Sequence, residues 1–275
     1  MTAKAKHRSI YRMPTIFGPA TGPRRGPDGR GFECRDTPKS TSVSVSFRSN
    51  TEQLSALLPE CFELNGDPVV TVMATYMKEI EWLAGRGYNM LGVTFPATYR
   101  GKEETIHGPF LAVLWENLTD PIITGREELG YAKIYCSLPE LRIDGSSACC
   151  TANWLDFEFL EMNVENLKEQ HIPDPPTPSP VDGTLHYKYM PRTGDWGDSD
   201  ASYAVITPAH TPNRRITGLW SGNGSLSWNR ARWEDMPTQY NIINGLADLE
   251  VCEVLSGTVT KTIGGKDLSD QRILK

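Results

Sequence analysis

The side chains that most often carry out chemistry, histidine and cysteine, are scattered along this sequence. The chain holds five histidines and six cysteines, and they show no CxxC pair and no Cys/His spacing typical of metal ligands. The sequence also lacks a phosphate-binding glycine loop, a dinucleotide fingerprint, a serine elbow and an HExxH zinc motif. We therefore expect neither a metal nor a cofactor.

Aromatic residues are the other group that stands out: Trp82, Tyr88, Trp154, Trp220, Trp228 and Trp233. Two interpretations account for them. They pack in the core and pair across strands, or some of them line an apolar pocket for a fairly hydrophobic substrate. Tyr88 is the candidate for substrate binding in the second case.

Composition and charge limit the partners. The 275 residues are 39% apolar and carry 28 basic against 34 acidic side chains, a net charge of -6. This composition is that of a globular protein with a substantial core. A negative surface repels phosphate backbones, so we expect no nucleic-acid partner.

Location follows from what the sequence lacks. It holds no run of about 18 apolar residues, so we expect no membrane span. Residues 1–14 are basic without an apolar stretch, which argues against a secretory signal. Cys149 and Cys150 are adjacent and would point to opposite faces of a strand. We therefore expect a cytoplasmic protein with reduced thiols.

Hydrophobic periodicity predicts a strand-rich fold. Alternating or β-branched segments predict ten strands, at 42–47, 69–77, 91–99, 109–116, 147–162, 184–190, 202–207, 215–220, 224–228 and 248–263. Asn50 is placed to cap a short helix over 51–58, and a second small helix is expected over 235–243. Residues 119–138 should pass from a loop through a brief helical turn into a strand. Many short strands with few helices favour a closed or sandwiched antiparallel sheet.

Domain organisation is simple in this interpretation. Residues 1–40 form an extended arm rich in Pro, Gly and Arg, 41–265 form one domain, and 266–275 form a tail. The proline-rich stretch at 173–180 is either an insertion or a domain boundary.

Four segments resemble the acetoacetate decarboxylase family in order and spacing. GREELGYAK, at 125–133, is similar to the family signature, in which a Gly-Arg-Glu turn precedes the Schiff-base lysine. Residues 46–64 resemble the family's early strand, helix and Leu-Leu-Pro turn. Residues 88–101 resemble its central hairpin, and 219–251 its Trp-x-Gly segment and closing strand. The resemblance implies an α+β, predominantly antiparallel β-cone or barrel around a central cavity, assembled into homo-oligomers.

The resemblance makes Lys133 the candidate nucleophile. A free lysine has a pKa of roughly 10.4, so only about one in 2500 is neutral at pH 7 and able to attack a carbonyl. Burial or a nearby cation must lower that pKa, a strategy for which acetoacetate decarboxylase is itself the standard example. The residues around Lys133 are largely apolar, namely Tyr131, Ala132, Ile134 and Tyr135. The competing interpretation is an exposed lysine that pairs with a glutamate of the turn.

The sequence also departs from the family pattern. Decarboxylases of the family carry a second lysine after the nucleophile, where this chain has Ile134. Two family glutamates fall on Met73 and Met90, and the early family arginine falls near Ser40. We predict that both methionines line the cavity of Lys133. Such a pocket would be apolar and adaptable.

Other polar residues are weaker candidates for the site. Arg126 would orient a substrate carboxylate or form a structural ion pair, and Glu116 and His107 are acid–base candidates. Glu79 or Glu81 would partly replace the missing family carboxylates. The resemblance implies a small-molecule carbonyl compound as the substrate of this site.

The sequence is compatible with three functions. The first is a Schiff-base lyase that acts by decarboxylation or by aldol and dehydration chemistry. The second is a cyclase that uses the apolar cavity to fold its substrate without covalent catalysis. The third is a non-catalytic binder of small hydrophobic molecules.

Overall fold

The computed structural model describes residues 9–172 and 180–275. The predicted proline-rich loop at 173–180 lies almost wholly outside these residues. Within them, no helix has the length and apolar character needed to cross a membrane.

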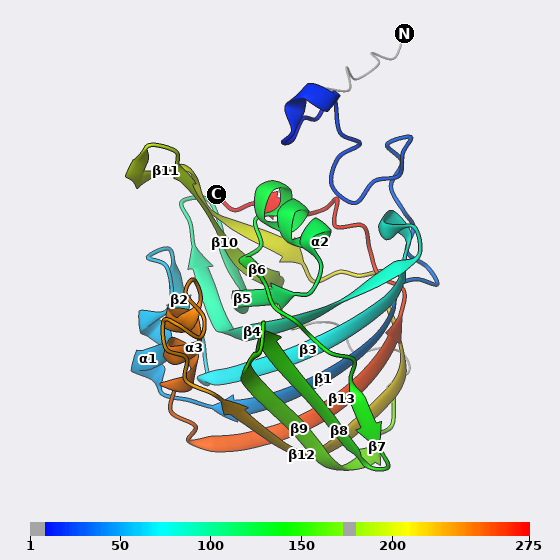
Figure 1. Cartoon of the computed structure of the whole chain (residues 1–275), viewed down its shortest axis with the longest axis vertical. Coiled ribbons are helices and arrows are strands. Elements are labelled where there is room, and N and C mark those ends of the chain that lie inside the picture. The colour runs from blue at the N-terminus through cyan, green and yellow to red at the C-terminus, as the bar shows by residue number, and fades with distance from the viewer. Residues whose placement is uncertain (1–8, 173–179) are drawn as a thin grey trace.

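One large sheet dominates the described part of the chain (Figure 1). Its strands are β1 (Lys39–Arg48), β2 (Phe62–Leu64), β3 (Val69–Ile80), β4 (Arg86–Arg100), β5 (Thr105–Glu116), β6 (Lys133–Tyr135), β7 (Arg142–Asp144), β8 (Ser147–Trp154), β9 (Phe157–Glu169), β10 (Gly183–Arg192), β11 (Asp195–Pro208), β12 (Arg215–Trp228), β13 (Glu253–Ile263) and β14 (Arg272–Ile273). The α-helices are α1 (Thr51–Ala56), α2 (Thr119–Thr124) and α3 (Tyr240–Ala247). Short helical turns are η1 (Thr15–Phe17), η2 (Glu81–Leu83) and the π-helical η3 (Gly125–Leu129).

The strand order is β14-β11-β10-β5-β4-β3-β1-β13-β12-β9-β8-β7, with β2 paired to β4 and β6 paired to β5. Almost all pairs are antiparallel, and β5 pairs in parallel with β6 and β10. The predicted antiparallel class is therefore confirmed. The sheet curls strongly but does not close, because its path ends on the short edge strands β7 and β14 rather than joining them.

Several predicted boundaries were wrong, including that of the helix expected over 235–243, which is α3 and begins at Tyr240. The single strand expected at 147–162 is the β8–β9 hairpin, which turns at Leu155, a non-glycine residue with a φ of 50°. The local sequence marks that turn only through Asp156, because the positive φ falls on Leu155 rather than on glycine or asparagine. The strands expected at 215–220 and 224–228 are one strand, β12. The cap at Asn50 is confirmed, since its side chain accepts hydrogen bonds from the backbone amides of Glu52 and Gln53.

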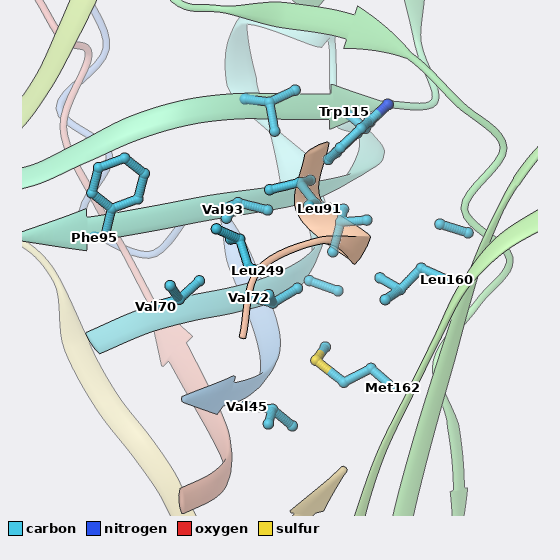
Figure 2. Packing of buried hydrophobic residues seen from close by; sticks show 14 of the residues in the cluster. Val45, Val70, Val72, Leu91, Val93, Phe95, Trp115, Leu160, Met162 and Leu249 are labelled. Carbon is cyan, nitrogen blue, oxygen red and sulfur yellow. The ribbon is translucent and has the colours of Figure 1, made fainter. Parts of the chain in front are cut away.

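The core lies on one face of the curved sheet. Val72 of β3, Val93 of β4 and Trp115 of β5 pack there against Leu160 and Met162 of β9, and all are buried (Figure 2). Figure 1 shows β8 and β9 wrapping around so that they lie opposite β3 and β1. This apolar packing fills the inside of the curve.

Side chains alternate between the two faces of a strand. Residues next to the core positions on β3, β4 and β5 therefore point to the opposite face of the sheet. Figure 1 shows α2, β6 and the N-terminal arm gathered above β4 and β5 on that side. The candidate site lies beneath these elements.

Candidate active site

Lys133 begins the short strand β6, which pairs with β5 so that Lys133 lies beside Leu114. Arg126 Nη1 donates to the backbone carbonyl of Lys133 at 2.9 Å and fixes this strand to the preceding turn. The Lys133 side chain is only 1% exposed. The exposed-lysine interpretation is therefore wrong, because the side chain points into the protein.

Three groups surround the Lys133 amine. Its Nζ lies 2.8 Å from Glu116 Oε1 and donates to the carbonyl of Pro121 at 3.1 Å. The same nitrogen lies 4.9 Å from the ring centre of Tyr131. Glu116 is fully buried, and neither of its oxygens has a well-directed hydrogen bond within the described residues. The contact is therefore a close ion pair that leaves lone pairs of Glu116 without a partner among the described residues.

Gly125 explains why the signature carries a glycine. A methyl group on Gly125 would lie 2.6 Å from Cε and 2.9 Å from Nζ of Lys133. The backbone of Gly125 has ordinary helical angles, so the demand is for space rather than for conformational freedom. Gly130, by contrast, ends η3 in the left-handed region with a φ of 81°. Gly130 therefore allows the sharp turn after η3, and Gly125 leaves room for the Lys133 side chain to pack against that turn.

Burial shifts the acid–base balance of this pair. It lowers the pKa of Lys133 to about 8, an effect that Glu116 opposes and that Arg24 reinforces. Burial likewise raises the pKa of Glu116 against the attraction of Lys133. Both shifts bring the neutral amine and the neutral acid closer to physiological pH.

Arg24 is the residue that sequence reasoning missed. It comes from the N-terminal arm and lies beside Tyr88, close to Tyr131 and Glu116. Its guanidinium carbon is 5.4 Å from the ring centre of Trp82, and its Nε is buried without a hydrogen-bond partner among the described residues. The ion pair between Arg25 and Asp267 holds the arm alongside it. Arg24 supplies the second cation that the sequence around Lys133 lacks.

A cavity of about 310 Å³ joins these residues. Its polar and charged lining consists of Arg24, Thr75, Tyr88, Thr94, Glu116, Tyr131, Lys133 and Thr184. The rest of its wall is apolar and includes Met73, Met77 and Met90. The prediction that Met73 and Met90 share a cavity with Lys133 is therefore confirmed, and Tyr88 and Glu116 lie there too.

A smaller hollow of about 50 Å³ adjoins this cavity. It shares Arg24, Met77 and Tyr88 with the cavity, and its own wall includes Phe32 and Trp82. Arg24 therefore lines both spaces, and Glu81 and Asp267 are among the other residues of the smaller one.

Other sequence candidates lie elsewhere. His107 is exposed on β5, where its Nδ1 meets the hydroxyl of Thr98 at 2.8 Å. Arg126 does not line the cavity and acts on the Lys133 backbone instead. Glu79 is exposed and pairs with Lys39, and Glu81 lines only the smaller hollow. The carboxylate that the structure brings to Lys133 is Glu116.

The chain matches the family model described as acetoacetate decarboxylase (ADC) over residues 12–267. The chain belongs to the acetoacetate decarboxylase family. Among curated relatives, the acetoacetate decarboxylase of Clostridium botulinum (strain Eklund 17B / Type B) is 26% identical over 128 residues. That match covers 46% of this chain and 48% of the relative, so it spans about half of the length of each.

Several solved structures share the fold. Acetoacetate decarboxylase from Legionella pneumophila is 16% identical with a TM-score of 0.62, over 88% of this chain and 86% of that one. An acetoacetate decarboxylase-like enzyme from Sphingomonas wittichii RW1 is 17% identical with a TM-score of 0.63, over 86% and 92%. The enduracididine biosynthesis enzyme MppR, complexed with pyruvate, is 14% identical with a TM-score of 0.60, over 91% and 95%. Family membership supports an enzyme of carbonyl chemistry.

Proposed function

We propose that this chain is a Schiff-base lyase in which Lys133 condenses with the carbonyl group of a keto acid. The observation that carries the proposal is the buried Lys133 amine 2.8 Å from the buried Glu116 carboxyl group, at the wall of a cavity of about 310 Å³. Burial supplies the neutral amine that nucleophilic attack requires. Glu116 supplies a proton carrier at the same nitrogen.

The first chemical step balances on these two residues. The neutral Lys133 amine adds to the carbonyl carbon, and one of its protons ends on the former carbonyl oxygen. The neutral Glu116 acid then donates its proton to that hydroxyl group, which leaves as water. The products are an iminium ion on Lys133 and a Glu116 carboxylate beside it, and their opposite charges stabilise each other in the low-dielectric cavity.

The iminium ion can then act as an electron sink in two ways. A carboxylate in the β position leaves as CO2, and its electron pair forms an enamine that takes up a proton. Alternatively, the Glu116 carboxylate removes a proton next to the iminium carbon, and the enamine adds to an aldehyde before water is lost. The structural neighbour MppR has been solved with pyruvate and with the condensation product of pyruvate and imidazole 4-carboxaldehyde, which favours the second course.

The cavity wall supports a particular class of substrate. Arg24, with its unpaired buried Nε, is the group suited to a substrate carboxylate. The methionines and the adjoining aromatic hollow suit an apolar arm larger than that of acetoacetate. A cavity of about 310 Å³ lies at the small end of the range for ligand pockets, so the substrate is a compact keto acid.

The test is reductive trapping. The protein is incubated with pyruvate or acetoacetate at pH 8 and treated with borohydride, and the labelled peptide is identified by mass spectrometry. We expect one adduct, on Lys133, and none in Lys133→Ala or in Lys133→Arg, whose guanidinium stays protonated. Labelling of other lysines with Lys133 unmodified, or no adduct at all, would contradict the proposal.

A non-covalent cyclase is the second candidate. The three cavity methionines and the aromatic hollow favour it, since an adaptable apolar wall can fold a flexible substrate. Turnover that persists in Lys133→Ala would select this function. Uptake of ligand without turnover would instead indicate a binding protein.

A further inference from the structure

Three polar residues near the Lys133 amine are joined in series by hydrogen bonds. The Tyr131 hydroxyl is 2.9 Å from Thr207 Oγ1, and the same Thr207 oxygen is 2.9 Å from His186 Nε2. The rings of Tyr131 and His186 pack with centroids 4.2 Å apart. The Tyr131 ring also lies 4.9 Å from Lys133 Nζ, so this hydrogen-bonded series joins a tyrosine beside the amine to a buried histidine.

Strand geometry places these residues together. On β10 and β11, Thr184 and Thr207 lie directly opposite each other, and Thr184 lines the cavity. His186 lies two residues further along β10, so it points to the same face as Thr184. Leu185 and Ile206 point the other way, into the core. His186 and Thr207 are thus on the cavity side of the sheet.

The His186 imidazole is held neutral. It is completely buried, and burial together with the nearby Lys133 amine lowers its pKa to about 3. Its Nδ1 has no hydrogen-bond partner within the described residues. A buried donor without a partner is rarer in proteins than an under-satisfied acceptor. We therefore assign the hydrogen to Nε2, which faces Thr207, and leave Nδ1 as the bare nitrogen.

This tautomer sets the direction of both hydrogen bonds in the series His186–Thr207–Tyr131. His186 Nε2–H donates to Thr207 Oγ1, so the Thr207 hydroxyl hydrogen is left to donate to the Tyr131 oxygen. The Tyr131 hydrogen is then free to point elsewhere. Burial raises the pKa of Tyr131, so the hydroxyl keeps this hydrogen across the physiological range.

We propose that His186 and Thr207 are positioning residues that turn the Tyr131 hydroxyl into a hydrogen-bond donor aimed into the cavity, at the oxygen of a carbonyl compound reacting with Lys133. The inference rests on the proposed Schiff-base function. A donor at that oxygen stabilises the negative charge that develops as the amine attacks. Without His186, the Tyr131 hydroxyl can donate its hydrogen to Thr207 instead of accepting one from it. Tyr131 then has no hydrogen left to donate into the cavity.

The experiment measures the rate at which pyruvate forms a borohydride-trapped adduct on Lys133. Tyr131→Phe removes the donor and should slow adduct formation about 100-fold. His186→Phe and Thr207→Val should each slow it about tenfold, with little change in the pyruvate concentration for half-maximal rate. Thr207→Ser keeps the hydroxyl, and His186→Gln keeps a donor near Nε2, so both should recover most of the rate.

A double variant separates positioning from a purely structural effect. If His186 acts only through Tyr131, then Tyr131→Phe combined with His186→Phe is no slower than Tyr131→Phe alone. If the rate losses of the two single variants multiply in the double variant, the proposal is overturned. A second measurement does not depend on His186 variants that fold: the imidazole nitrogen shifts of the wild type should identify the Nε2–H tautomer, and an Nδ1–H tautomer would overturn it.

The outcomes distinguish this inference from the function on which it rests. No adduct in the wild type overturns the Schiff-base function and the inference together. If the adduct on Lys133 forms in Thr207→Val and in Tyr131→Phe at the same rate as in the wild type, the inference alone is overturned.

Discussion

The pKa of Lys133 can be measured through the stability of the fold. The native chain releases the proton of this lysine at a pKa of about 8, against 10.5 for an unperturbed lysine. Between these pH values the unfolded chain binds a proton that the native chain does not. Stability must therefore rise with pH across that window, and it is lowest, with respect to this group, below pH 8.

The size of the effect follows from the shift. The difference between 10.5 and about 8, at 1.36 kcal/mol per pKa unit, gives about 3 kcal/mol. Lys133 is almost fully buried, so screening by solvent does not reduce this figure. Lys133→Met keeps the length of the side chain and removes the titration. The wild type should therefore gain about 3 kcal/mol relative to Lys133→Met as the pH rises from 7 to 10.5.

The assay is urea unfolding of both proteins at intervals of half a pH unit over that range. The comparison is the difference between the two free energies of unfolding, because tyrosine and cysteine titrations common to both proteins cancel. A difference that stays constant from pH 7 to 10.5 would show an ordinary lysine pKa and refute the desolvation argument. The rate of borohydride trapping should rise through the same apparent pKa of about 8.

Further predictions concern Gly125, Arg24 and the arm. Gly125→Ala should abolish Lys133 trapping, because its methyl group takes the space of the amine, whereas Gly245→Ala, which has no neighbour within 4 Å, should leave trapping unchanged; equal trapping in both variants would contradict the contact. Arg24→Gln should raise the pyruvate concentration for half-maximal trapping about tenfold or more, since an ion-paired hydrogen bond is worth about 1.5–3 kcal/mol. The acetone concentration for half-maximal trapping should stay nearly the same, although trapping of both ketones slows as the pKa of Lys133 rises without Arg24; an equal rise in both half-maximal concentrations would count against carboxylate binding. Ile16 and Phe17, which are 85% and 82% exposed, should be covered by a second copy of the chain, so their replacement by serine should lower the mass seen by light scattering; a wild type that runs as a 30.6 kDa monomer would rule this out.

The sequence predicts the central strands well because their residues alternate. Val43, Val45 and Phe47 of β1 face the core, and the serines between them face away, so period two is visible in the letters. The β8–β9 turn at Leu155 escapes prediction, since its positive φ is imposed by the hairpin and not by the residue. Tertiary pairing here overrides local preference.

The site divides in the same way. Lys133, Met73 and Met90 can be placed because a resemblance fixes their positions along strands. Arg24 cannot, because the arm has no periodicity and its route over the cavity depends on contacts such as that of Arg25 with Asp267. His186 looks like any other scattered histidine until the pairing of β10 with β11 sets it diagonally from Thr207.

The charges of the cavity bear on which reaction the site supports. A protonated Lys133 and Arg24 face one carboxylate, Glu116, so a single substrate carboxylate would complete a neutral site. Loss of CO2 requires that the departing carboxylate give up its charge, and an arginine that binds this carboxylate stabilises the ground state more than the transition state. Aldol addition and dehydration leave the carboxylate in place, and Arg24 keeps its partner through every step. A carboxylate held by Arg24 is therefore better suited to orienting a keto acid for condensation than to leaving as CO2.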